Sequence, residues 1–300
     1  MSDKIELLSP ALLDEEREIV TEFAQLARKL RIGLGWHYLL DLAWIVRNLP
    51  LERGMTVLDA GAGLGVLQWY LADHGVNVVS VDRIDRASAA LRFGNSYRLR
   101  GLGAGDVDTQ GSALRHDIGH KRIVRDLAGY LQGRYERWLR PKAAGSGGTV
   151  TFYRADLADM DLVPGASIDH VVAVSALEHN EPEELPIVAT ELWRVLRPGG
   201  TILATLGASA TDDWFHEPSR GWCYTEATLR AVFHLSEKAP SNYSQYIEIL
   251  AAVRSCAELR DNLARFYFKS GNNGMPWGNW DPKYLSVGVR VTKESGSQAC

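Results

Sequence analysis

The stretch "VLDAGAGLGV", residues 57–66, places Asp59 at the end of an apolar run and then glycine at every second position. Glycines at such a turn let a cofactor approach the backbone closely. Dinucleotide-binding loops have the spacing G-x-G-x-x-G. Val66 stands where the third glycine of that spacing belongs. The loop is therefore shaped for a nucleoside cofactor, and its spacing disfavours a dinucleotide.

Two further acids follow at the ends of the next expected strands. "VVSVDRID" puts Asp82 roughly 20 residues past the glycines, where an acid accepts the hydroxyl protons of a ribose. Arg83 follows it, as an arginine does in NADP sites, but the acid is kept. "RADLADM" places Asp156 and Leu157 after a third strand. Asp82 therefore predicts a ribose more directly than the glycines predict any one cofactor.

The pattern D-x-G-x-G-x-G, with these acids and the later "VVAVSALEH" and "LRPGGTILAT", resembles the class I S-adenosylmethionine-dependent methyltransferases. The resemblance covers residues 54–85 and 149–207 closely. It implies that Asp156 binds the adenine amino group and Leu157 contacts the ring. It also implies that helices before the first strand cover the cofactor, which would place Trp36, His37 and Tyr38 in a lid. The predicted cofactor-binding residues are Asp59, Gly61, Ala62, Gly63, Gly65, Asp82, Arg83, Asp156, Leu157, Ser175, Trp36 and Tyr38.

Methyl transfer is a direct displacement that mostly needs alignment and exclusion of water. A base helps when the acceptor is a hydroxyl. His179 follows the fourth strand, and histidine is the side-chain type most often used as a general base, so it is the first candidate base. Glu178 beside it is expected to orient the acceptor, and His37 is the second candidate base. Alternatively, His179 caps the helix that begins near Pro182, and His37 only packs its helix on the sheet.

Aromatic residues gather in two later segments, "WFHEPSRGWCY" and "SGNNGMPWGNWDPKY". Stacking rings beside polar amides suit a small molecule or a saccharide, although the same rings could seal the core. The predicted acceptor-binding residues are Trp214, His216, Trp222, Tyr224, Trp277 and Trp280. Residues 83–142 contain thirteen Lys and Arg against six Asp and Glu. Such a charge favours an anionic acceptor, unless it is an ordinary solvated face. Oxygen is the favoured methylated atom over nitrogen.

The elements that must position these residues alternate as a doubly wound α/β fold does. Strands at 55–61 and 76–82 flank a helix at 66–74, and the resemblance implies a seven-stranded, mostly parallel sheet with an antiparallel last strand at 283–293. Further expected elements are helices at 11–31, 36–48, 121–139, 181–197 and 244–268, a helix capped by Thr225, strands at 149–156, 168–174, 201–207 and 233–241, and a loop at 100–112. The predicted domains are an N-terminal helical lid (1–50), a methyltransferase domain (51–293) with cap insertions at 86–148 and 243–283, and a flexible tail (294–300).

Composition sets the remaining expectations. The chain has 300 residues, 46% of them hydrophobic, and a net charge of −4, which is typical of a globular protein with a sizeable core and gives no case for nucleic acid. We expect no membrane span, no signal peptide and a cytoplasmic setting. No metal site is expected, because "HDIGH" (His116 and His120) lacks a third ligand. The alternatives left open are an NAD(P)-dependent oxidoreductase and a non-catalytic S-adenosylmethionine-binding protein.

Overall fold

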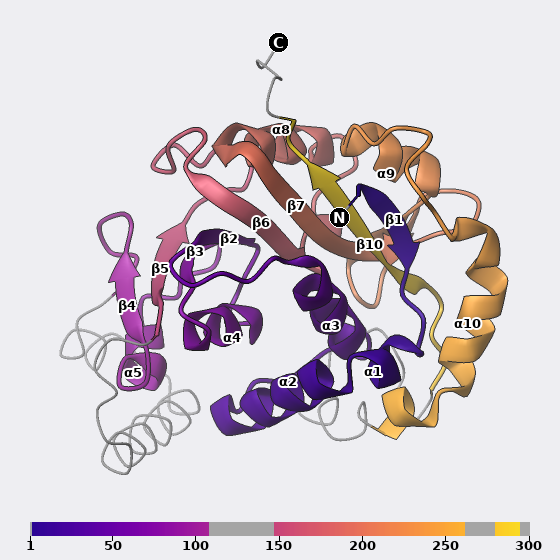
Figure 1. Cartoon of the computed structure of the whole chain (residues 1–300), viewed down its shortest axis with the longest axis horizontal. Coiled ribbons are helices and arrows are strands. Elements are labelled where there is room, and N and C mark those ends of the chain that lie inside the picture. Colours follow the sequence, from indigo (N-terminus) through magenta and orange to yellow (C-terminus); the bar gives the residue numbers. More distant parts are fainter. Residues whose placement is uncertain (1, 108–146, 262–279, 295–300) are drawn as a thin grey trace.

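The computed structural model describes residues 2–107, 147–261 and 280–294, which form a mixed sheet with helices on both sides (Figure 1). Within these ranges the sheet has ten strands. Eight of them follow the order β1-β10-β7-β6-β2-β3-β5-β4, and the β8–β9 hairpin joins at β7. The strands are β1 (Lys4–Leu7), β2 (Thr56–Ala60), β3 (Asn77–Asp82), β4 (Arg98–Gly101), β5 (Thr149–Arg154), β6 (Ile168–Val174), β7 (Leu196–Ala208), β8 (Trp214–His216), β9 (Gly221–Tyr224) and β10 (Leu285–Thr292).

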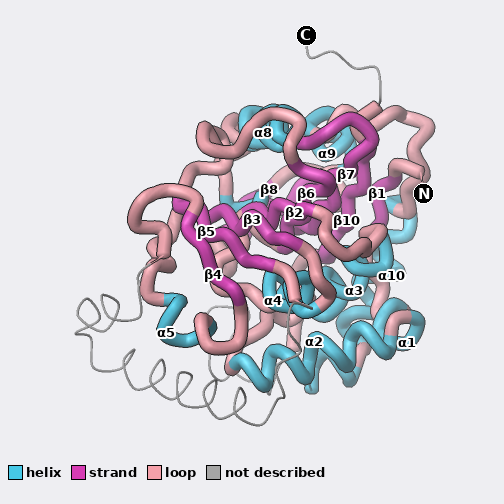
Figure 2. Tube along the Cα trace, turned by 60° about the vertical axis from the view of Figure 1, so that its left-hand side comes forward, coloured by secondary structure: helices cyan, strands magenta, loops and turns pink. Residues whose placement is uncertain are grey.

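The helices cover both faces of this sheet, with α8 and α9 on one side and α2, α3 and α4 on the other (Figures 1 and 2). Their bounds are α1 (Leu12–Glu15), α2 (Arg17–Leu30), α3 (Tyr38–Asn48), α4 (Leu67–Asp73), α5 (Ala89–Phe93), α8 (Leu185–Val195), α9 (Glu226–Val232) and α10 (Tyr246–Ser255), with short 3₁₀ turns η1 (Leu177–His179) and η2 (Tyr243–Gln245). The predicted doubly wound α/β fold is confirmed.

The central strands β2, β3, β5, β6 and β7 pair in parallel. β2 and β6 are buried along most of their length, whereas β3 and β5 also carry partly or fully exposed residues. β10 is antiparallel to β7, as expected for the last strand. Helix α3 packs on β6, β7 and β10, whereas α4 packs on β3 and β5. This arrangement fixes the carboxyl ends of β2, β3 and β6 side by side.

Several elements differ from the sequence predictions. The sheet has ten strands rather than seven, because β1, β4, β8 and β9 add to it and the strand predicted at 233–241 does not form. β1 lies within the segment predicted as a helical lid, yet it pairs antiparallel with β10. β4 overlaps the predicted loop and extends the sheet beside β5, so this part of the first predicted insertion does not cap the sheet. These strands are short and lie at edges, where little apolar patterning is needed.

Two predictions after β9 also need correction. The strand predicted at 233–241 is mostly turns, with a single bridge between Ser241 and Ile5. The helix predicted at 244–268 is interrupted, because α10 ends at Ser255 and Cys256 is extended. The Thr225 cap is confirmed, since its side chain accepts a hydrogen bond from the Thr228 N–H. The helix predicted at 121–139 lies outside the described residues.

Candidate active site

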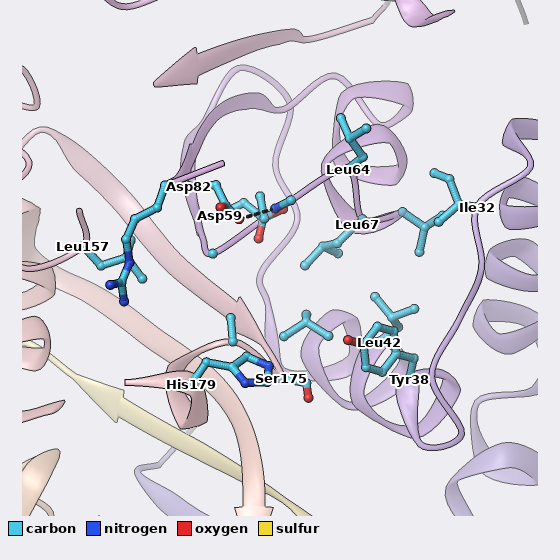
Figure 3. A pocket seen from close by; sticks show the side chains of 18 of the residues that line it. Ile32, Tyr38, Leu42, Asp59, Leu64, Leu67, Asp82, Leu157, Ser175 and His179 are labelled. Carbon is cyan, nitrogen blue, oxygen red and sulfur yellow. Dashed lines mark hydrogen bonds between the residues drawn. The ribbon is translucent and has the colours of Figure 1, made fainter. Parts of the chain in front are cut away.

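A cavity of about 440 Å³ lies at the carboxyl ends of β2, β3 and β6 (Figure 3). In parallel α/β sheets ligands bind where neighbouring strands lead to helices on opposite faces. The chain leaves β2 through α4 toward β3, while β6 lies on the other side of β2. The cavity is lined by Ile32, Gly33, Tyr38, Leu42, Asp59, Gly61, Ala62, Gly63, Leu64, Gly65, Val66, Leu67, Asp82, Arg83, Leu157, Val174, Ser175, Ala176, His179 and Asn180.

The glycine loop needs its glycines for two reasons. Gly61 has φ +69° and Gly63 has φ +49°, a backbone region that other residues rarely adopt. A Cβ on Gly61 would lie 2.5 Å from Cβ of Ala176, which is in the turn after β6. The loop backbone therefore approaches that turn closely and forms a wall of the cavity without projecting side chains into it.

A buried polar network that the sequence did not reveal holds this loop in place. The Arg86 guanidinium donates to the carbonyl oxygens of Gly63 (3.1 Å), Ser80 (2.8 Å) and Tyr153 (3.0 Å). Gln68 Nε2 also donates to the Gly65 carbonyl at 3.0 Å, and its Oε1 accepts from the Ser80 hydroxyl. Burial lowers the pKa of Arg86, although Asp82 and Asp59 oppose that shift.

Asp59 is buried, with 3% of its surface exposed, and it lines the cavity. Within the described residues its carboxylate has no hydrogen-bond or ion-pair partner. Burial raises the pKa of Asp59 to about 7, and the Arg86 charge only partly opposes this. A buried acid without a donor calls for a cationic ligand group.

Asp82 and Asp156 have different surroundings. Asp82 lines the cavity, and its carboxylate accepts the N–H groups of Gly63 (2.7 Å) and Ile84 (2.9 Å). Asp156 is not among the lining residues. Its Oδ1 accepts from the Ala158 N–H at 3.0 Å, and its Oδ2 lies 3.7 Å from Arg83 Nη1. The predicted adenine contact of Asp156 thus stays a prediction, whereas Leu157 does line the cavity.

A second chamber of about 100 Å³ adjoins the first, with Tyr38, Ser175 and His179 lining both. The remaining wall residues come from four separate parts of the chain. They are Gly35, Trp36, His37, Glu178, Gly207, Ser219, Gly221, Trp222, Cys223 and Tyr284. The structure thus brings all three candidate catalytic residues, His179, Glu178 and His37, to one chamber beside the nucleoside-type cavity.

His179 is held in a defined tautomer. Its Nδ1 lies 2.8 Å from the Arg220 carbonyl oxygen, which can only accept, so Nδ1 carries the hydrogen. Nε2 is then free of a proton in the neutral ring and can accept one. Its side chain is exposed and borders both cavities, as Figure 3 shows for the first.

Glu178 is the buried acid of the second chamber, with 6% of its surface exposed. Its Oε1 accepts from the Ser175 hydroxyl at 2.5 Å, while Oε2 has no hydrogen-bond partner among the described residues. Burial raises the pKa of Glu178, and the neighbouring His179 and Ser175 offset part of that rise. Ser175 itself has φ +46°, a strained conformation of the kind found at functional sites.

His37 belongs to a buried chain of polar groups. Its Nδ1 lies 2.6 Å from Oδ2 of Asp41, and its Nε2 lies 3.4 Å from the Tyr284 hydroxyl. Ser286 donates to the other oxygen of Asp41. Burial lowers the pKa of His37, but the Asp41 carboxylate outweighs it and the net pKa is raised. The Asp41 carboxylate therefore stabilises the protonated form of the ring.

The predicted aromatic residues separate into two groups. Trp36 and Trp222 line the second chamber. Trp280 packs edge-on against Trp36 at 5.7 Å, and His216 contacts the Tyr284 ring at 5.0 Å, so both stand behind the wall. Trp214 and Tyr224 belong to β8 and β9 and are not among the lining residues. Trp277 lies outside the described residues. Tyr284 is a wall residue that the predicted site omitted.

Comparison with known proteins agrees with this fold. Residues 133–200 match a family model described as a methyltransferase domain. The structure of Haemonchus contortus phosphoethanolamine N-methyltransferase 2 with phosphomonomethylethanolamine and S-adenosylhomocysteine superposes with a TM-score of 0.51 at 14% identity, over 94% of this chain and 59% of that chain. The chain has the class I methyltransferase fold.

A second structure of that Haemonchus contortus enzyme, with S-adenosyl-L-methionine, also gives a TM-score of 0.51 at 14% identity, over 95% of this chain and 59% of the other. The present methyltransferase-fold chain thus spans 59% of the length of this enzyme. No curated protein matches the sequence. Among the described residues, no helix is long and apolar enough to cross a membrane.

Proposed function

We propose that this chain binds S-adenosylmethionine in the first cavity and transfers its methyl group to a small-molecule acceptor in the second chamber. The proposal is carried by the environment of Asp59. This buried carboxylate lies beside the glycine loop, and the described residues give it no hydrogen-bond donor. The methionine part of the cofactor carries an ammonium group, which would satisfy this carboxylate. When bound, the cofactor supplies an electrophilic methyl group on a sulfonium.

The other cavity residues fit the rest of such a cofactor. Asp82 keeps lone pairs for ribose hydroxyls, although each of its oxygens already accepts one backbone N–H. Leu64 and Leu157 offer apolar surface for an adenine ring. A volume of about 440 Å³ lies within the usual range for ligand pockets.

An NAD(P) cofactor fits this cavity less well. A dinucleotide brings a pyrophosphate to the N-terminus of the helix after the loop. Asp59 lies at that end of the cavity, and its carboxylate would repel a phosphate. Arg83, the residue that suggested NADP, is engaged with Asn180 at 2.9 Å. These features favour methyl transfer over hydride transfer.

For the acceptor, we propose a small molecule or a saccharide, as the sequence favoured. The second chamber borders the cofactor cavity through Ser175 and His179, so a group placed there can face the methyl carbon. His179 and Glu178 are the groups proposed to handle the acceptor proton. A cytoplasmic setting stays a prediction from the sequence. So does the expectation that the acceptor carries a negative charge that the basic segment 83–142 attracts.

The test of catalysis is the release of S-adenosylhomocysteine from S-adenosylmethionine with a panel of amine, alcohol and saccharide acceptors. Turnover with any of these supports the proposal. A thermal shift with S-adenosylhomocysteine but no turnover across the whole panel would instead support a non-catalytic cofactor-binding protein.

A further inference from the structure

The second chamber has a chemical character that selects among acceptors. Its volume of about 100 Å³ is less than a quarter of the 440 Å³ of the first cavity. A chamber of this relative size favours the end of an acceptor over a whole large molecule. The residues that line the chamber therefore indicate the chemistry of the acceptor's reacting group rather than that of the whole acceptor.

Glu178 places an unsatisfied hydrogen-bond acceptor in the second chamber. Its Oε2 is buried and has no hydrogen-bond partner in the part of the chain that the structure describes, whereas Oε1 accepts from Ser175. A buried carboxylate oxygen without a donor is costly, so a ligand that supplies an N–H or O–H is favoured there.

The walls around Glu178 are aromatic. Trp36, Tyr38, Trp222 and Tyr284 line the chamber, and the Trp36 and Tyr284 rings meet at 5.6 Å in an edge arrangement. Aromatic faces attract a cation by about 0.5–2 kcal/mol per contact, a gain that a neutral hydroxyl does not receive. Rings together with a carboxylate are the combination that binds an ammonium group.

The other charged groups of the chamber leave its preference for a cation unchanged. The described lining residues that can carry a full positive charge are His37 and His179, and His37 Nδ1 lies 2.6 Å from Oδ2 of Asp41. Of the described residues that line the chamber, none is a lysine or an arginine. A carboxylate or phosphate at the reacting end of the acceptor would find neither of these as a counter-charge.

We propose, resting on the function proposed above, that the second chamber holds the ammonium end of a small primary or secondary amine and that this nitrogen is the methyl acceptor. Glu178 Oε2 takes one proton from the ammonium, which frees the nitrogen lone pair. The nitrogen attacks the methyl carbon of the sulfonium donor; the N–C bond forms as the C–S bond breaks. The donor leaves as a neutral thioether, and the methylated nitrogen carries the positive charge. This replaces the oxygen acceptor that the sequence favoured.

The experiment is a titration of the protein saturated with S-adenosylhomocysteine, with n-propylamine, 1-propanol and propionate as matched probes. At about 50 mM, above the roughly millimolar Kd expected for four non-hydrogen atoms, propylamine should bind at least tenfold more tightly than either other probe. Glu178→Gln should weaken propylamine binding at least tenfold and leave the affinity for S-adenosylhomocysteine within twofold. Glu181→Gln, an exposed neighbour, is the matched control and should change neither.

The outcomes distinguish failure of the amine-acceptor proposal from failure of the proposed methyltransferase function. No binding of S-adenosylhomocysteine overturns the proposed function. If it binds, then equal affinity for 1-propanol or propionate, no propylamine binding, or an unchanged Glu178→Gln variant overturns the amine acceptor. Should Glu178→Gln fail to fold, Trp222→Leu decides, because loss of one aromatic face should weaken propylamine about threefold without affecting 1-propanol. Equal loss for both probes overturns the proposal.

Discussion

Replacing Asp59 by asparagine should stabilise the cofactor-free protein while weakening its cofactor binding. Burial raises the pKa of Asp59 from 3.8 to about 7. Between these values the folded state holds a proton that the unfolded state releases, so the free energy of unfolding falls as pH rises. A shift of about three units corresponds to about 4 kcal/mol at 1.36 kcal/mol per unit.

The asparagine variant lacks this pH-dependent loss. The difference in free energy of unfolding between Asp59→Asn and the natural sequence should therefore increase with pH. Above pH 7 this difference should exceed the difference near pH 4 by about 4 kcal/mol. Urea unfolding at pH 4.5, 6 and 7.5, followed by tryptophan fluorescence, measures this difference. The matched control is Asp14→Asn, whose side chain is 85% exposed and whose ion pair with Arg17 is worth little.

The same variant should bind S-adenosylhomocysteine at least tenfold more weakly, because an amide is a poor counter-ion for an ammonium. A difference in unfolding free energy that stays flat with pH would refute the argument about burial. Unchanged S-adenosylhomocysteine affinity would refute the role of Asp59 in binding.

Four other perturbations test the site. Between pH 7 and pH 5 the Kd for S-adenosylhomocysteine should rise by up to tenfold per unit, because its ammonium must displace the Asp59 proton; a flat titration by calorimetry contradicts this. Gly61→Ala should lower the free energy of unfolding by about 1–3 kcal/mol, since φ +69° and Cβ of Ala176 leave no room; an unchanged urea midpoint refutes it. Arg86→Met should cost about 3–5 kcal/mol in the same assay, because several buried carbonyls lose their donor; a loss below 1 kcal/mol would show that the network is dispensable. His179→Gln should reduce kcat about tenfold and move the acidic limb of the pH–rate profile upward, because its charge lowers the pKa of Glu178; an unshifted profile with full kcat removes it from the reaction.

The cofactor side of the site could be predicted because its signals are local. Strand β2, the glycine loop and α4 are consecutive in the chain, and the apolar run with its acid and glycines is readable there. Asp82 follows in the next strand and meets the loop, as expected from the parallel pairing of β2 and β3.

The acceptor side could be predicted only in part: His37, Glu178, His179 and Trp222 were expected there but Tyr284 was not, because the chamber is assembled from residues far apart in the sequence. Trp36, Glu178 and Tyr284 meet only after α3, η1 and β10 have packed together. The Arg86 network was hidden for a related reason, since one arginine among many on a basic segment gives no sign of burial. β4 offered only one partly buried apolar residue, Leu99, so its place in the sheet depended on pairing with β5.

The first cavity is proposed to bind the methyl donor rather than a dinucleotide. Isothermal titration of the full chain with S-adenosylhomocysteine and, separately, with NADP⁺ tests it most directly. We predict saturable binding of S-adenosylhomocysteine at one site per chain and no saturable heat with NADP⁺. In Asp59→Asn the affinity for S-adenosylhomocysteine should fall at least tenfold. Saturable binding of NADP⁺ with none of S-adenosylhomocysteine would contradict it.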